Sequence, residues 1–107
     1  MRIRKNTETM DEYEMDFIAS VSDALAHPVR LAIFRYIMQC NKSMEKVCNK
    51  DLCANFDYAQ ATISQHVGKL VKSGLLEVKQ ENRFSYYFAN MGILMKYIDA
   101  TKKFSVL

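Results

Sequence analysis

The sequence predicts a mainly α-helical fold of about five helices with a small β-hairpin, which a third short strand can extend. Apolar residues recur at helical spacing over most of the 107-residue chain, which has one proline and three glycines. Two runs rich in β-branched and aromatic residues, at 75–80 and 84–89, interrupt this pattern. A chain of this length is expected to form one domain over 1–107, with 1–9 disordered.

The composition predicts a cytoplasmic protein with reduced thiols. No apolar run is long enough to cross a membrane, and residues 1–11 lack the apolar core of a signal peptide. Three cysteines, an odd number, favour free thiols over a disulfide framework. The net charge is +3, but residues 6–24 are acidic and the rest of the chain is basic, so an anionic partner should meet the second part.

The first and last helices, predicted at 10–25 and 91–104, have broad apolar faces for so small a chain. Their apolar stripes consist of Met10, Tyr13, Phe17, Val21 and Ala24 in the first helix and of Leu94, Tyr97, Ile98, Thr101 and Phe104 in the last. Such faces indicate a homodimer that uses these two segments as dimerisation helices. The alternative is that both stripes complete the core of the monomer.

Two further helices are predicted between these ends. Pro28 is expected in the first turn of the second helix, with His27 packing against or capping its start. A short third helix is predicted over 49–56. The segment 44–48 before it can pair with the hairpin as an edge strand.

The segment 57–73 predicts a recognition helix. Asp57 and Gln60 have the spacing of a capping box at its start, and Gly74 is the expected stop. Its buried face would consist of Ile63, Val67 and Leu70. The opposite face is polar and has no carboxylate, which favours contact with DNA. We expect base contacts from Gln60, Thr62, Ser64 and Gln65, and phosphate contacts from Lys69, Lys72, Lys79 and Arg83.

A hairpin over 75–89 follows this helix directly. Asn82 lies in its turn and tolerates a positive φ, and Lys79 and Arg83 lie near its tip. A recognition helix followed by a basic hairpin is the element order of a winged helix, in which the hairpin lies along the DNA backbone. The alternative interpretation is an ordinary small α+β domain with a solvated polar helix.

These segments, in order, resemble the ArsR/SmtB family of winged-helix repressors. The resemblance rests on LAHPVRLAIFRYI, DLCANFDYAQATISQHVGKLVKSGLL and ENRFSYYFAN, and covers about residues 25–90. It implies a homodimer that binds a palindromic operator in double-stranded DNA and is released by an inducer. The chain departs from the family pattern at Asn82, where a glycine is usual, at Ala59, where a serine often caps the helix, and in a longer link before the third helix.

The cysteines are the only sequence feature that suggests an inducer. The resemblance implies an arsenical-sensing cluster at positions that match Cys48, Lys50 and Cys53, of which one is not a cysteine. Cys48 lies at a helix start near lysines, which favours the thiolate, whereas Cys53 is expected to be buried. Cys40 could approach Cys48 across the link. Packing residues, a redox sensor and a soft-metal or metalloid site all remain open.

No other site emerges from the sequence. The last helix has Asp99 but no histidine, so the family's zinc site there is not expected, and we expect no cofactor. His66 is expected to be structural or to contact phosphate. Without a glycine-rich loop or a nucleophile elbow, an enzyme is not expected. The remaining alternative function is a winged-helix module that binds proteins and has no operator.

Overall fold

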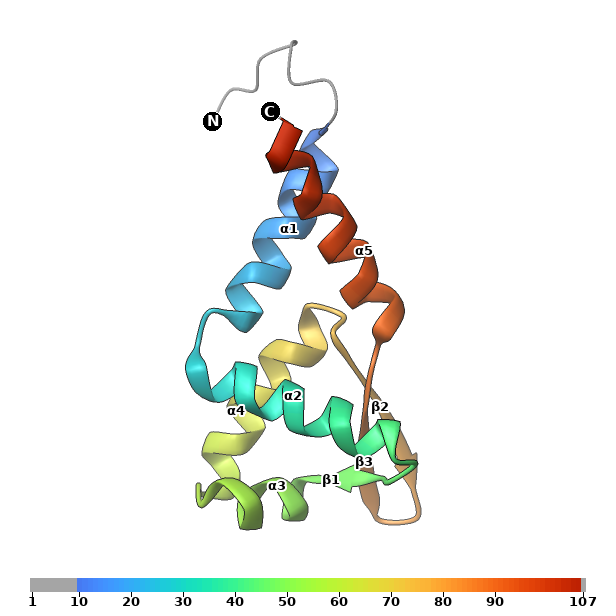
Figure 1. The fold of residues 1–107 in the computed structure, drawn as a ribbon. Helices are drawn as coiled ribbons and strands as arrows, with labels where there is room; N and C mark the ends of the chain where they lie inside the picture. Colours follow the sequence, from blue (N-terminus) through green and yellow to red (C-terminus); the bar gives the residue numbers. More distant parts are fainter. Residues whose placement is uncertain (1–9, 107) are drawn as a thin grey trace.

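The computed structural model describes residues 10–106; the expected disorder of 1–9 lies outside this range. The described chain forms the helices α1 (Glu12–Leu25), α2 (Pro28–Lys42), α3 (Asn49–Phe56), α4 (Gln60–Lys72) and α5 (Met91–Lys102), the strands β1 (Val47–Cys48), β2 (Leu76–Glu81) and β3 (Phe84–Ala89), and the 3-10 turn η1 (Lys103–Val106). The predicted winged helix-turn-helix fold is confirmed (Figure 1).

Side-chain caps fix several helix starts. The Asp11 carboxylate accepts a hydrogen bond from Glu14 N–H at 2.8 Å, so α1 begins after Asp11. His27 Nδ1 accepts from Val29 N–H at 3.1 Å, which confirms that His27 caps α2. These bonds satisfy N–H groups that have no partner within the first turn of a helix.

The predicted start of α4 is wrong. Asp57 does not open this helix: it ends α3 with a left-handed backbone at φ 53°. Two helices at an angle need a sharp turn between them, and aspartate tolerates this conformation. α4 therefore begins at Gln60, and its N-cap, Ala59, forms no side-chain hydrogen bond. The capping arrangement lies instead at α3, where Cys48 N–H donates to Asp51 Oδ2 at 2.9 Å.

The sheet has the strand order β1-β3-β2, with both pairs antiparallel. Asn82 forms the turn between β2 and β3 with φ 57°, as expected. The predicted edge strand is present but short, with Val47 opposite Tyr87 and Cys48 opposite Tyr86. We call β2, β3 and their turn the wing.

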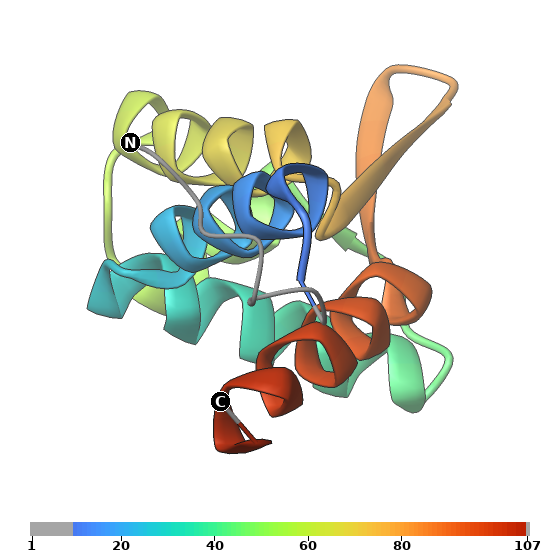
Figure 2. The same cartoon turned by 90° about the horizontal axis from the view of Figure 1, so that it is seen from above.

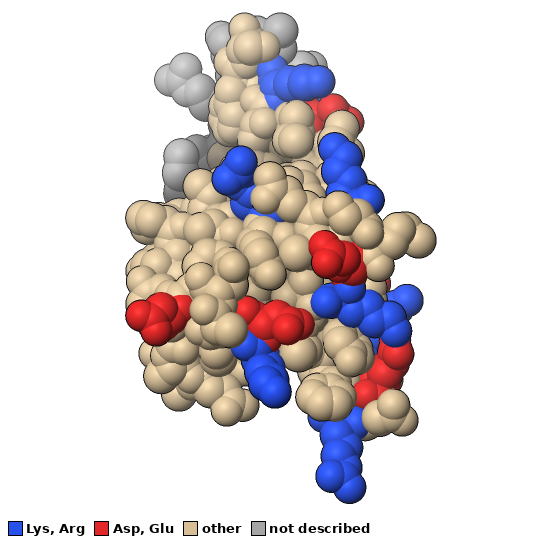
Figure 3. All heavy atoms as spheres, turned by 60° about the horizontal axis from the view of Figure 1, so that its bottom comes forward, with Lys and Arg blue, Asp and Glu red and all other residues tan. Residues whose placement is uncertain are grey.

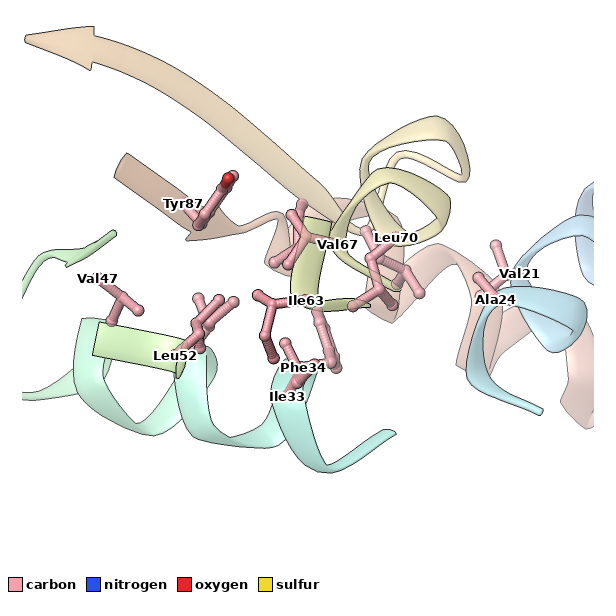
Figure 4. Close-up of a cluster of buried hydrophobic side chains, with 13 residues drawn as sticks. Val21, Ala24, Ile33, Phe34, Val47, Leu52, Ile63, Val67, Leu70 and Tyr87 are labelled. Atoms are coloured by element: carbon pink, nitrogen blue, oxygen red, sulfur yellow. The ribbon is translucent and has the colours of Figure 1, made fainter. Parts of the chain in front are cut away.

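The molecule is elongated, with extents of 50 × 25 × 22 Å. Its main core lies among α2, α3, α4 and the sheet, and Val21 and Ala24 of α1 complete it (Figure 4). Beyond these residues, α1 and α5 converge into a two-helix projection at the end of the molecule opposite the wing (Figure 1). Among residues 10–106, the buried residues of a second core in this projection are Met10, Ile18 and Ala100. Met10 precedes α1, and α5 ends at Lys102, so both terminal helices are shorter than predicted.

Within residues 10–106, no single helix is both long and apolar enough to cross a membrane. α1 and α2 reach that length only together, and they are bent by 94° to each other.

Candidate nucleic-acid interface

A fully buried stripe holds α4 in place. Ile63 and Leu70 have no exposed surface and Val67 is 3% exposed, and all three belong to the main core together with residues of α2 and α3 (Figure 4). α3 and α4 lie beside the wing at the end of the molecule opposite the projection (Figure 1). The burial of this stripe leaves the other face of α4 turned to solvent.

The exposed face of α4 has the predicted character. It contains Gln60, Ser64, Gln65, Lys69 and Lys72, and no residue of α4 is a carboxylate. Thr62 differs from these residues because it is partly buried. Ser64 already has a partner, since its hydroxyl accepts from Asn49 Nδ2 at 3.1 Å. Gln60 and Gln65 are the amides of this face that can both donate to and accept from a base edge.

The wing brings cations beside this face, but they are accompanied by carboxylates. Lys79 and Arg83 are exposed, Arg83 in the turn next to Asn82, and Lys79 Nζ lies 5.3 Å from the centre of the Phe88 ring. Glu81 forms an ion pair with Lys46, with 2.7 Å between Oε2 and Nζ. Lys and Arg side chains alternate with Asp and Glu across this end of the molecule (Figure 3). The exposed face of α4 thus carries cations without carboxylates, whereas the wing carries both.

Sequence reasoning missed a hollow between α3, α4 and the wing. Its volume is about 310 Å³, and Asn49, Lys50, Gln60, Arg83 and Phe84 are among the residues that line it. Lys50 and Asn49 therefore share a surface with two predicted contact residues. Asn49 Oδ1 is buried and has no hydrogen-bond partner in the described chain. The sequence feature that could have predicted this surface was Lys50, a cation in the first turn of α3, the helix directly before the recognition helix.

Two histidines meet where α2 begins against α4. The ring centres of His27 and His66 are 4.8 Å apart, where α2 crosses α4 (Figure 1). Arg30 lies nearby and caps α1, since its guanidinium donates to the Ala24 and Asp23 carbonyls at 2.8 and 3.0 Å. Burial, followed by the charges of His27 and Arg30, lowers the pKa of His66 from its usual 6.5. His66 thus packs against His27 on the flank of α4, which agrees with a structural role.

The folded protein should lose stability as the pH falls below about 6.5. The unfolded chain binds a proton at His66 more readily than the folded chain does, because the pKa of His66 is lower in the folded protein. The stability that neutral His66 contributes is therefore complete above its pKa in the unfolded chain, and it is lost as the pH falls through its pKa in the folded protein. Thermal unfolding of the wild type and of His66→Gln between about pH 7.5 and 5.5 measures this, because the variant should lose less stability. An equal loss in both proteins would contradict the role of His66.

The cysteines do not lie as expected. Cys48 is only 9% exposed, because β1 pairs it with Tyr86, and its thiol donates to Asp51 Oδ2 at 3.3 Å. Cys53 and Cys40 are the partly exposed cysteines, so the expectation of a buried Cys53 beside an accessible Cys48 is wrong. Among residues 10–106, no three His, Cys, Asp or Glu side chains converge to hold a metal ion.

A thiol reagent should label Cys40 and Cys53 before Cys48 in the folded protein. The Cys48 thiol is shielded by the sheet and held by Asp51, whereas the other two thiols are partly exposed. Mass spectrometry of peptides after short labelling at neutral pH gives the order, and labelling in denaturant shows whether it comes from the fold. First labelling at Cys48 would restore it as the reactive thiol.

Comparison with known proteins agrees with this geometry. The family described as "Helix-turn-helix domain" matches residues 25–79. An ArsR-like transcriptional regulator from Rhodococcus sp. RHA1 is 21% identical over 86% of this chain and 82% of its own, with a TM-score of 0.75. NolR from Sinorhizobium fredii is 21% identical over 97% and 95%, with a TM-score of 0.68. The homodimeric winged helix-turn-helix DNA-binding domain Mb0332 from Mycobacterium bovis is 20% identical over 94% and 87%, with a TM-score of 0.69. No curated protein matched.

The fold is that of the winged helix-turn-helix proteins, and the solved structures it matches are those of transcriptional regulators and DNA-binding domains. The chain belongs to the helix-turn-helix domain family, and its winged helix-turn-helix is ArsR/SmtB-like, as the sequence predicted.

Proposed function

We propose that this protein is a homodimeric transcriptional repressor that binds a palindromic operator. The observation that carries the proposal is the exposed face of α4, which combines two free glutamine amides with lysines, contains no carboxylate and lies beside the wing. In this arrangement α4 enters the major groove and the wing follows the backbone. Base edges are read by Gln60, Thr62, Ser64 and Gln65. Phosphates are contacted by Lys69, Lys72, Lys79 and Arg83.

The two-helix projection supports dimerisation. It exposes large apolar side chains that its small core leaves uncovered: Tyr13 at 88%, Met95 at 50%, Ile98 at 36% and Phe104 at 53%. We call these residues the projection patch. Covering them with a second copy removes apolar surface from water. Charge is complementary as well, since α1 exposes Glu12 and Asp16 and α5 exposes Lys96 and Lys102.

A symmetric dimer presents two copies of α4 to two half-sites about 34–36 Å apart. Occupation of such a site excludes other proteins from the same DNA, and a signal that changes the dimer geometry ends the repression. The cytoplasm is the proposed place of action, because reduced thiols persist there. Release through the cysteines requires a modifiable thiol; the partly exposed Cys40 and Cys53 are better placed for this than Cys48.

Selection of bound DNA from a random pool tests the proposal. An enriched palindrome, with an affinity that falls steeply as salt rises, is the expected result, because phosphate contacts release counterions. The same selection in the presence of thiol oxidant and of arsenite tests release through the cysteines. A protein-binding module would enrich no sequence and would show little salt dependence, and that result would reject operator binding.

Two substitutions should weaken DNA binding in different ways. Gln65→Ala should cost about 1–3 kcal/mol on the operator and relax specificity at one base pair per half-site, because a base-edge contact is lost. Arg83→Ala should weaken binding to operator and random DNA alike. It should also lower the slope of log affinity against log salt by about one for each phosphate contact that is lost. Fluorescence anisotropy on both DNAs at several salt concentrations measures the difference.

Arg35→Ala is a matched control, because Arg35 is an exposed cation on α2 that is neither a predicted DNA contact nor part of the projection patch. It should bind both DNAs as the wild type does. Equal losses on operator and random DNA for Gln65→Ala would remove Gln65 from the base-reading residues.

A further inference from the structure

A groove lies where the end of α2, the end of β3 and the start of α5 meet. Its volume is about 470 Å³, and it is lined by Met38, Gln39, Asn41, Lys42, Ala89 and Met91. These three segments lie side by side in both ribbon views (Figures 1 and 2). None of the predicted DNA-contact residues lines the groove.

The walls of the groove suit an apolar ligand. Met38 on α2, Met91 on α5 and Ala89 on β3 supply apolar surface from three different elements. Thioether side chains adapt to irregular shapes, so the two methionines can fit a flexible chain. The volume lies within the range of small-molecule sites, about 300–1,000 Å³.

The polar groups of the groove favour an anionic head on that ligand. The Asn41 amide is already used, because its Oδ1 accepts from Ala89 N–H at 2.8 Å and its Nδ2 donates to the Glu45 carbonyl at 3.2 Å. Lys42 is exposed, and it is absent from the ion pairs found within residues 10–106. Its ammonium can therefore pair with a carboxylate at the groove.

We infer that this groove binds a small molecule with an apolar chain and a carboxylate head, of the medium-chain fatty acid class, and that this ligand releases the operator. The binding part stands alone, whereas the release part rests on the proposed function.

The position of the groove provides the coupling. α2 packs on α4 through the main core, and α5 carries Met95 and Ile98 of the projection patch. A chain inserted between Met38 and Met91 moves α5 relative to α2. In a dimer held by α5, this movement changes the spacing of the two α4 helices, and an operator with fixed half-sites then fits less well.

The binding part is tested without DNA, on the full chain, by calorimetric titration with octanoate and with 1-octanol. Octanoate should bind more tightly than octanol, by about tenfold for one charge-assisted contact. Lys42→Gln should remove this preference, and Met91→Trp, which fills the groove, should abolish binding. Leu31→Trp is the matched control, because Leu31 has a similar exposure of 51% near the other end of α2, and it should bind as the wild type does.

Operator binding with and without octanoate tests the release part. Saturating octanoate should weaken wild-type binding at least about fivefold and leave the affinity of Met91→Trp unchanged. No octanoate binding, or equal binding by Met91→Trp, would overturn the inference. The inference would also be overturned if sedimentation showed that Met91→Trp is a monomer. That result would mean that a second copy of the chain, and not a small ligand, covers the groove. A protein that binds octanoate and no operator would refute the proposed function and leave the ligand site standing.

Discussion

Ile98→Glu should yield monomers and weaken operator binding by about 100-fold or more. Ile98 is 36% exposed on α5 within the projection patch, so the substitution disturbs the monomer little but places a charge in an apolar dimer interface. A monomer binds one half-site at a time and loses the gain from two linked contacts. Analytical ultracentrifugation and anisotropy on the operator measure both effects.

The choice of residue matters for this test. Leu94, the other position that the sequence suggested, packs against the main core, so a charge there would also destabilise the monomer. Leu31→Glu is the control, because Leu31 is an exposed leucine on α2 outside the projection patch. It should remain dimeric and bind the operator. A dimeric Ile98→Glu with full affinity would place the interface elsewhere.

Ile63→Ala should lower the free energy of unfolding by about 2–5 kcal/mol, which is a large fraction of the stability of a domain this size. Ile63 has no exposed surface, and it belongs to the main core with Leu52 of α3 and Ile33 of α2. Truncation leaves a cavity that backbone shifts fill only in part. Urea unfolding followed by circular dichroism measures the loss.

Gln65→Ala, two residues along the same helix, is the matched control for stability. Gln65 is exposed, so this change should alter the free energy of unfolding by less than about 0.5 kcal/mol while it weakens operator binding. The pair of variants separates the buried from the exposed face of α4. A large loss of stability in Gln65→Ala would mean that its side chain supports the fold.

Local patterns predicted most of the elements. α3 has the predicted bounds 49–56, and Asn82 forms the hairpin turn with the expected positive φ. Helical periodicity and turn chemistry depend on near neighbours in the chain, so they are readable from sequence. The start of α4 was wrong because Asp57 and Gln60 also satisfy a local rule, while the angle between α3 and α4 required Asp57 to take a left-handed turn.

The sequence by itself determined the winged helix-turn-helix order, the polar face of α4 and the buried stripe beneath it. Only the tertiary structure decided the surroundings of single groups. Cys48 lies opposite Tyr86 in the sheet and donates to Asp51, His66 contacts His27, and Met38 and Met91 line the same groove. These contacts, apart from that of Cys48 with Asp51, join segments far apart in the chain, and their geometry follows from how helices and sheet pack, which residue spacing does not specify.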